Sequence, residues 1–113
     1  MKSGRFIPER GDLVWLNFSP QSGHEQAGRR PVLCLSPKEY NAKTGLGIFC
    51  PVTSKAKGYP FEVKLPEGLK VSGVILADQI RSLDWKARNA EFIEKAPKEV
   101  LEETLELVRL LLF

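Results

Sequence analysis

The chain has 113 residues, of which 42% are hydrophobic and 27% are charged, and its formal net charge at pH 7 is +3. These values suit a compact domain and exclude a disordered chain, a collagen-like chain and a disulfide scaffold. We expect one domain over residues 1–113, small enough that dimerisation would help to stabilise it. No apolar run reaches the roughly 20 residues that span a bilayer, and the first residues lack the apolar core of a signal peptide. We therefore expect a cytoplasmic protein without a membrane partner.

Short strands are predicted along most of the chain, from apolar runs and from the alternation of apolar and polar residues. They cover residues 13–18, 31–35, 46–52, 60–65, 73–77 and 79–83. Between the first two strands lies a polar, glycine-containing loop at residues 19–30, whose length is typical of functional loops. Residues 37–45 are predicted to form a turn.

The hydrophobic period changes near the end of the chain. From Ala96 onward apolar residues recur at helical spacing, and Pro97 suits the first helical position. The many short strands followed by one helix predict a mainly β fold. We expect a small, partly closed antiparallel β-barrel with a C-terminal α-helix.

Charge is unevenly distributed along the chain. Residues 90–113 contain six glutamates against Lys95, Lys98 and Arg109, so the rest of the chain carries the positive excess. A basic body is typical of a protein that binds a polyanion or an acidic protein segment. The alternative is a chance imbalance on a solvated surface.

The cysteines and the single histidine give little support to metal or redox chemistry. Cys34 and Cys50 both lie in apolar runs, which predicts reduced cysteines in the core. His24 belongs to no Cys/His cluster with zinc spacing, so we expect no structural metal. The motifs of phosphate-binding P-loops, dinucleotide-binding folds and GxSxG hydrolases are absent.

Two arginines end the long polar loop and are candidates for binding phosphate. Arg29 and Arg30 directly precede Pro31, at the start of the second predicted strand. A guanidinium can bind two phosphate oxygens at once, and a strand mouth holds it more firmly than a loop tip does. The alternative is a pair of ordinary solvated arginines.

Two further segments carry side chains suited to nucleic acid. After the third predicted strand, hydroxyl, ammonium and aromatic groups follow one another at Thr53, Ser54, Lys55, Lys57 and Tyr59. Hydroxyls and cations contact phosphate, and an aromatic ring stacks on a base. Near the fifth strand, Asp78 and Gln79 offer donors and acceptors for base edges, next to Arg81. The alternatives are an ordinary turn and an exposed strand end.

Taken together, these segments resemble the MazF (PemK/Kid-like) toxins of bacterial toxin–antitoxin systems. The resemblance runs from about residue 8 to 88 and rests on GDLVW at 11–15, GHEQAGRRP at 23–31, TS at 53–54, KGYPFEV at 57–63 and LADQ at 76–79. It implies an SH3-like β-barrel, a homodimer and a sequence-specific endoribonuclease that cleaves single-stranded RNA without a metal or another cofactor. It also implies neutralisation by a cognate MazE-like antitoxin.

The same resemblance implies that the catalytic pair is Arg30 and Thr53. RNA cleavage without a metal uses the substrate's 2′-hydroxyl as nucleophile and leaves a 2′,3′-cyclic phosphate and a 5′-hydroxyl. A guanidinium stays protonated in proteins and is therefore a poor base, so we expect Arg30 to stabilise charge and Thr53 to hydrogen-bond the phosphate. Glu25 is the candidate that orients or deprotonates the 2′-hydroxyl, and His24 is a candidate acid. Glu25, His24 and Arg30 remain alternatives as proton carriers.

The other candidates are RNA-binding residues around this pair. They are His24, Gln26, Arg29, Ser54, Lys55, Lys57, Tyr59, Asp78, Gln79 and Arg81. Two other functions remain open at this point, a gyrase-poisoning toxin on the same barrel and a noncatalytic nucleic-acid-binding barrel. The presence of both Arg30 and Thr53 favours the nuclease.

Overall fold

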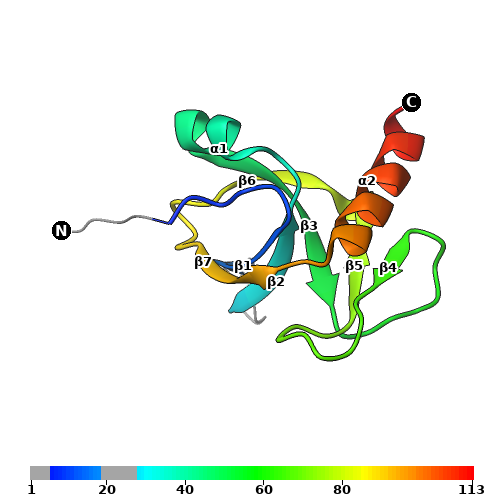
Figure 1. Ribbon diagram of the computed structural model, residues 1–113. Coiled ribbons are helices and arrows are strands. Elements are labelled where there is room, and N and C mark those ends of the chain that lie inside the picture. Colours follow the sequence, from blue (N-terminus) through cyan, green and yellow to red (C-terminus); the bar gives the residue numbers. More distant parts are fainter. Residues whose placement is uncertain (1–5, 19–27) are drawn as a thin grey trace.

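The computed structural model describes residues 6–18 and 28–113, which form one antiparallel sheet with two helices (Figure 1). The elements in chain order are β1 (Asp12–Asn17), β2 (Arg29–Cys34), α1 (Lys38–Thr44), β3 (Leu46–Thr53), β4 (Glu62–Lys64), β5 (Val74–Leu76), the 3-10 turn η1 (Ala77–Gln79), β6 (Arg81–Asp84), β7 (Glu91–Lys95) and α2 (Lys98–Leu112).

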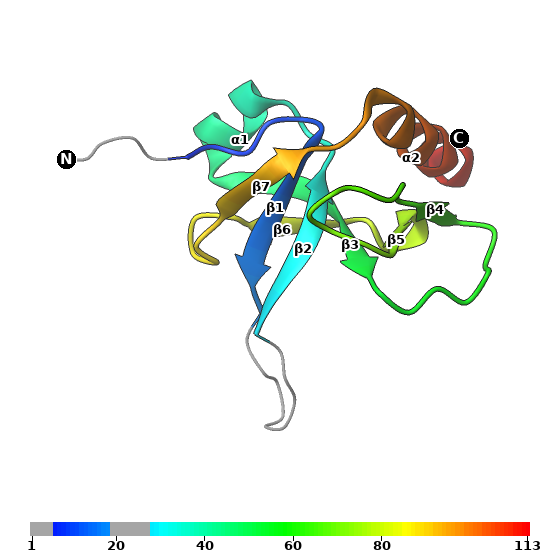
Figure 2. The ribbon, with the colours of Figure 1, turned by 60° about the horizontal axis from the view of Figure 1, so that its bottom comes forward.

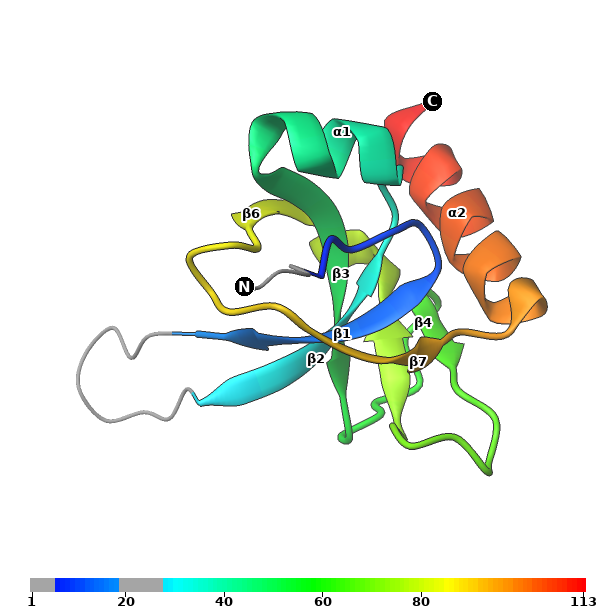
Figure 3. The ribbon, with the colours of Figure 1, turned by 60° about the vertical axis from the view of Figure 1, so that its left-hand side comes forward.

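The strands follow the order β4-β5-β3-β2-β1-β7, and β6 pairs with β3 beside this path. All of these pairs are antiparallel. Within the described residues β4 and β7 do not pair, so the barrel is open rather than closed. The predicted mainly β fold with a C-terminal helix is confirmed, and α2 lies beside β4 (Figure 3).

The central strands are covered on both faces, which explains their continuous apolar runs. Along β2, Leu33 belongs to one core cluster, whereas Val32 and Cys34 belong to another. The first cluster includes Val100 and Val108 of α2, so the helix covers that face.

Both cysteines lie in the core, as predicted. Cys34 and Cys50 are free thiols with no exposed surface. Burial raises the pKa of Cys34 to about 11 and that of Cys50 to about 12. Among the described residues, no helix is long and apolar enough to cross a membrane.

The structure differs from the predicted elements in four places. Residues 37–45 contain the helix α1 rather than only a turn, and this helix ends at Gly45, which has φ +76°. Its buried side chain is polar: Asn41 donates to the Pro8 carbonyl at 2.8 Å and accepts from the Ser36 hydroxyl at 2.6 Å. A helix anchored by an amide shows no apolar period in the sequence.

Strand β7 was absent from the prediction because its residues are mostly charged or exposed. The predicted strand 60–65 is confined to β4, since Pro60 and Pro66 flank it and proline cannot donate to a strand ladder. The segment with Asp78 and Gln79 forms the turn η1 instead of a strand end.

Candidate functional site

Arg30 and Thr53 lie on neighbouring strands at the same end of the sheet. β2 and β3 pair with Val32 opposite Pro51. Arg30 lies two residues before Val32 in β2, and Thr53 lies two residues after Pro51 in β3. Both residues line one hollow of about 460 Å³.

This hollow is positively charged. Strands β1, β2 and β3 and the loop between β4 and β5 line it, and this loop crosses β2 and β3 in Figure 2. The lining residues are Trp15, Arg29, Arg30, Pro31, Val52, Thr53, Ser54, Lys55, Lys70, Val71 and Ser72. Four of them are arginines or lysines, and none of the described lining residues is acidic. Such a set attracts an anion, and its cations and hydroxyls are the side chains that bind phosphodiester oxygens.

Backbone contacts on two sides fix Thr53. Its Oγ1 accepts a hydrogen bond from the Lys55 backbone N–H at 3.1 Å, a bond that does not use the hydroxyl proton. On the other side, Gly73 has φ +115°, and a Cβ at this position would lie 2.1 Å from the Thr53 carbonyl oxygen. Glycine alone allows both this conformation and this close approach. The end of β3 is thereby held against the residue that precedes β5.

Arg29 and Arg30 project to opposite faces of β2, because successive side chains of a strand alternate. The Arg29 guanidinium donates to Asn17 Oδ1 at 2.6 Å and to the Asn89 carbonyl at 2.8 Å, and it pairs with Glu91 Oε1 at 3.1 Å. These acceptors engage both of its terminal nitrogens. Both arginines line the hollow, and Arg29 does so as a braced charge.

The loop between β3 and β4 is organised by one carboxylate. Glu62 accepts hydrogen bonds from the backbone N–H groups of Lys57, at 3.0 Å to Oε2, and Gly58, at 2.9 Å to Oε1. The side chains of Lys55, Lys57 and Tyr59 are exposed on this loop, Tyr59 by 60%. Lys55 lines the hollow, and the other two lie beyond it along the loop.

The third predicted segment lies beside this loop and outside the hollow. The Ala77 N–H donates to the Phe61 carbonyl at 3.0 Å, which joins η1 to the start of β4. Asp78 and Gln79 of η1 are exposed, as is Arg81 at the start of β6. None of these three is among the described residues that line the hollow. The structure therefore brings Asp78 and Gln79 next to the β3–β4 loop rather than to Arg30.

Other candidate residues lie outside the described residues or escaped prediction. His24, Glu25 and Gln26 fall in the undescribed segment, so their roles stay predictions. Lys70 and Ser72 line the hollow but were not predicted. The sequence gives only a weak signal for their position: Lys70 and Ser72 are polar and exposed, and they flank Val71, which is apolar and buried in the core.

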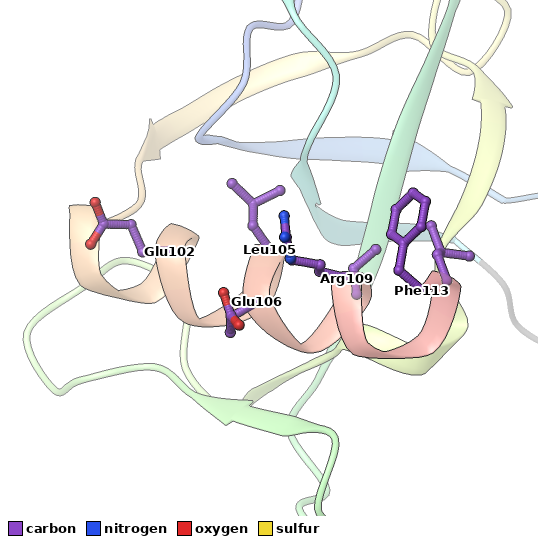
Figure 4. Close-up of a pocket in the computed structure, with 7 residues that line it drawn as sticks. Glu102, Leu105, Glu106, Arg109 and Phe113 are labelled. Atoms are coloured by element: carbon purple, nitrogen blue, oxygen red, sulfur yellow. The ribbon is translucent and has the colours of Figure 1, made fainter.

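A second hollow lies on α2 (Figure 4). Its volume is about 560 Å³, and it is lined by Glu102, Leu105, Glu106, Val108, Arg109, Leu112 and Phe113. It is larger than the hollow beside Thr53, but its lining has two carboxylates, one cation and no hydroxyl. These groups repel a phosphodiester more than they bind it. The chemistry of the lining therefore favours the smaller, cationic hollow as the functional site.

Comparisons with known proteins show what the whole chain is similar to. A family model described as PemK-like, MazF-like toxin of type II toxin-antitoxin system matches residues 9–112. The chain is 52% identical over 86 residues to the endoribonuclease toxin MazF of Escherichia coli strain K12, covering 76% of this chain and 77% of the relative. It is 39% identical over 101 residues to the Escherichia coli endoribonuclease PemK, covering 86% and 76%. A crystal structure of MazE-MazF (Form-II) from Deinococcus radiodurans aligns with a TM-score of 0.91 at 60% identity, over 96% of this chain and 97% of that chain.

Proposed function

Because the chain belongs to the PemK-like, MazF-like toxin family of type II toxin–antitoxin systems, we propose that the hollow between Arg30 and Thr53 is its RNA-cleaving site. The protein is an endoribonuclease toxin that an antitoxin neutralises, as its relatives' names and the MazE-MazF complexes among its structural neighbours indicate. The observation that supports the site is that Arg30 and Thr53, on the neighbouring strands β2 and β3, line one cationic hollow.

The proposed reaction is an internal transfer at phosphorus. The 2′-oxygen of the RNA forms a bond to the adjacent phosphorus, and the bond from phosphorus to the 5′-oxygen of the next nucleotide breaks. The 2′-hydroxyl loses its proton, and the departing 5′-oxygen gains one. The products are a 2′,3′-cyclic phosphate and a 5′-hydroxyl, and DNA is not cut because it lacks the nucleophile.

Arg30 and Thr53 stabilise the negative charge that builds up on the nonbridging oxygens. A guanidinium offers five N–H donors and no acceptor, so Arg30 acts as an electrostatic donor and not as a base. The Thr53 hydroxyl donates to a phosphate oxygen while its own Oγ1 is held by the Lys55 N–H. Glu25 is the proposed candidate that orients or deprotonates the 2′-hydroxyl, and His24 is the proposed candidate acid; both lie outside the described residues.

Single-stranded RNA is proposed to leave the hollow along the β3–β4 loop. Ser54 and Lys55 contact its backbone at the rim, and Lys57, Tyr59 and the exposed residues of η1 follow beyond it. Backbone contacts of this kind make affinity fall with salt. The protein is proposed to act in the cytoplasm as a homodimer, with a cognate MazE-like antitoxin as its protein partner.

The test is cleavage of a long single-stranded RNA in EDTA, with mapping of the fragment ends. We expect cleavage without added metal, and cyclic phosphate and 5′-hydroxyl ends. Arg30→Ala and Thr53→Val should each lower the cleavage rate by roughly 10²- to 10³-fold, the loss typical of one transition-state donor. Thr44→Val is the matched control, because Thr44 ends α1, which precedes β3, whereas Thr53 lies at the opposite end of β3. Near wild-type rates in both site variants, with folding intact, would refute the assignment.

A further inference from the structure

The loop between β4 and β5 forms one wall of the hollow and carries a cation that the proposed mechanism leaves without a role. Lys70 and Ser72 of this loop line the hollow, and both are exposed. Between them, Val71 is only 5% exposed and belongs to the core cluster. The burial of this one side chain turns the residues on either side of it outward, beside Thr53.

This wall is tied to the sheet at several points. The Lys70 backbone N–H donates to Glu94 Oε2 at 2.7 Å, and the Gly73 carbonyl accepts from the Leu65 N–H at 3.0 Å. Gly73 also packs directly on the carbonyl of Thr53. A cation on an anchored loop costs less ordering when it binds a ligand than a cation on a free loop.

A bulge in β7 explains why Glu94 reaches this loop. In the β1–β7 pair, Leu13 is opposite Glu94 and Trp15 is opposite Glu91, because the register shifts between Leu13 and Val14. Leu13 and Trp15 share a face of β1, so the two glutamates share a face although they are three residues apart, which a regular strand forbids. Glu91 holds the Arg29 guanidinium, and Glu94 holds the backbone of Lys70. One bulged strand therefore holds the guanidinium of Arg29 and the backbone of Lys70.

We propose that Lys70 binds a backbone phosphate of the RNA, and that Glu94 is a positioning residue that sets the loop for this contact. The proposal rests on the RNA-cleaving function proposed above. An ammonium is a point charge without the paired geometry that reads a base edge, so Lys70 contributes affinity rather than sequence preference. Lys70 of the β4–β5 loop and Arg30 of β2 both line the hollow, so two elements offer the phosphodiester a cation.

The first experiment measures binding of the full chain to an uncleavable RNA, with 2′-O-methyl at the cut site, at several salt concentrations. Lys70→Met should weaken binding by roughly three- to ten-fold at low salt and lower the slope of log K against log salt by about 0.7, the value of one phosphate contact on a single strand. Lys70→Arg should keep the slope. Lys43→Met, a matched change on α1 at the other end of β3, should leave both quantities unchanged.

The second experiment tests Glu94 through the same slope. Glu94→Gln retains an oxygen that accepts the Lys70 N–H, so its slope should match that of the wild type. Glu94→Ala should lower the slope. The double variant with Lys70→Met should lower it no further, because both changes remove the same contact between Lys70 and a phosphate. A Lys70→Met slope and affinity equal to those of Lys43→Met would overturn the proposal. Wild-type protein that neither cleaves nor binds RNA would instead overturn the proposed function.

Discussion

Gly73→Ala is the sharpest test of how Thr53 is positioned. A Cβ at residue 73 would lie 2.1 Å from the Thr53 carbonyl oxygen, whereas real Cβ contacts essentially never fall below 3.0 Å, so the two backbones must separate by about 1 Å. A misplacement of about 1 Å in a catalytic group can cost roughly 100-fold in rate. We therefore expect Gly73→Ala to lower the single-turnover rate of RNA cleavage by about two orders of magnitude.

The control separates this displacement from backbone strain. Gly68 also has a positive φ, +98°, but a Cβ there meets nothing within 4 Å, so Gly68→Ala carries the strain without the clash. Both variants should lose stability, and only Gly73→Ala should lose most of its activity. Circular dichroism gives the melting temperature of each variant, and the cleavage rates are compared at a temperature below both. Equal cleavage rates for the two folded variants would refute the argument that Gly73 positions Thr53.

Three further predictions concern the core and one ion pair. Cys34 and Cys50 should resist a thiol reagent at pH 8 in the folded protein and react after unfolding, because burial raises their pKa values to about 11 and about 12; fast reaction of the folded protein would contradict this. Asn41→Ala should lower the free energy of unfolding in urea by about 2–4 kcal/mol, because the side chain is fully buried and its removal leaves polar partners unpaired. The Asp12 carboxylate, 2.7 Å from Lys95 Nζ, raises the pKa of Lys95. Stability from this pair should be present below the ordinary lysine pKa of about 10.4 and be lost as pH rises through the raised value, and Lys95→Met should remove that part of the pH dependence of urea unfolding.

The sequence predicts those elements whose own residues determine their burial. The apolar runs of β1, β2 and β3 and the period of α2 are local signals, and the structure places these elements where they are predicted. α1 and β7 depend on partners far along the chain. Asn41 is buried because the Pro8 carbonyl accepts its amide, and β7 forms because β1 offers it an edge. Because these contacts are tertiary, the sequences of α1 and β7 show no hydrophobic periodicity from which the elements could be predicted.

The candidate site divides in the same way. Arg30 and Thr53 are predicted from motifs, and the pairing of β2 with β3 places them on neighbouring strands that line one hollow. Lys70 belongs to no motif. Its backbone N–H donates to Glu94 of β7, and a bulge in the β1–β7 pair sets the position of Glu94. The bracing of Arg29 is equally invisible in the sequence, because its acceptors lie on β1 and on the segment that leads into β7.

The conformation of the β3–β4 loop depends on the Glu62 carboxylate and not on the exposed side chains of the loop. Glu62 accepts hydrogen bonds from the backbone N–H groups of Lys57 and Gly58. The side chains of Lys55, Lys57 and Tyr59 face solvent and support no core packing. These exposed positions can therefore be substituted without changing the backbone conformation of the loop. A library randomised at those positions, with Glu62 and Gly58 retained, would test whether this loop sets the RNA preference.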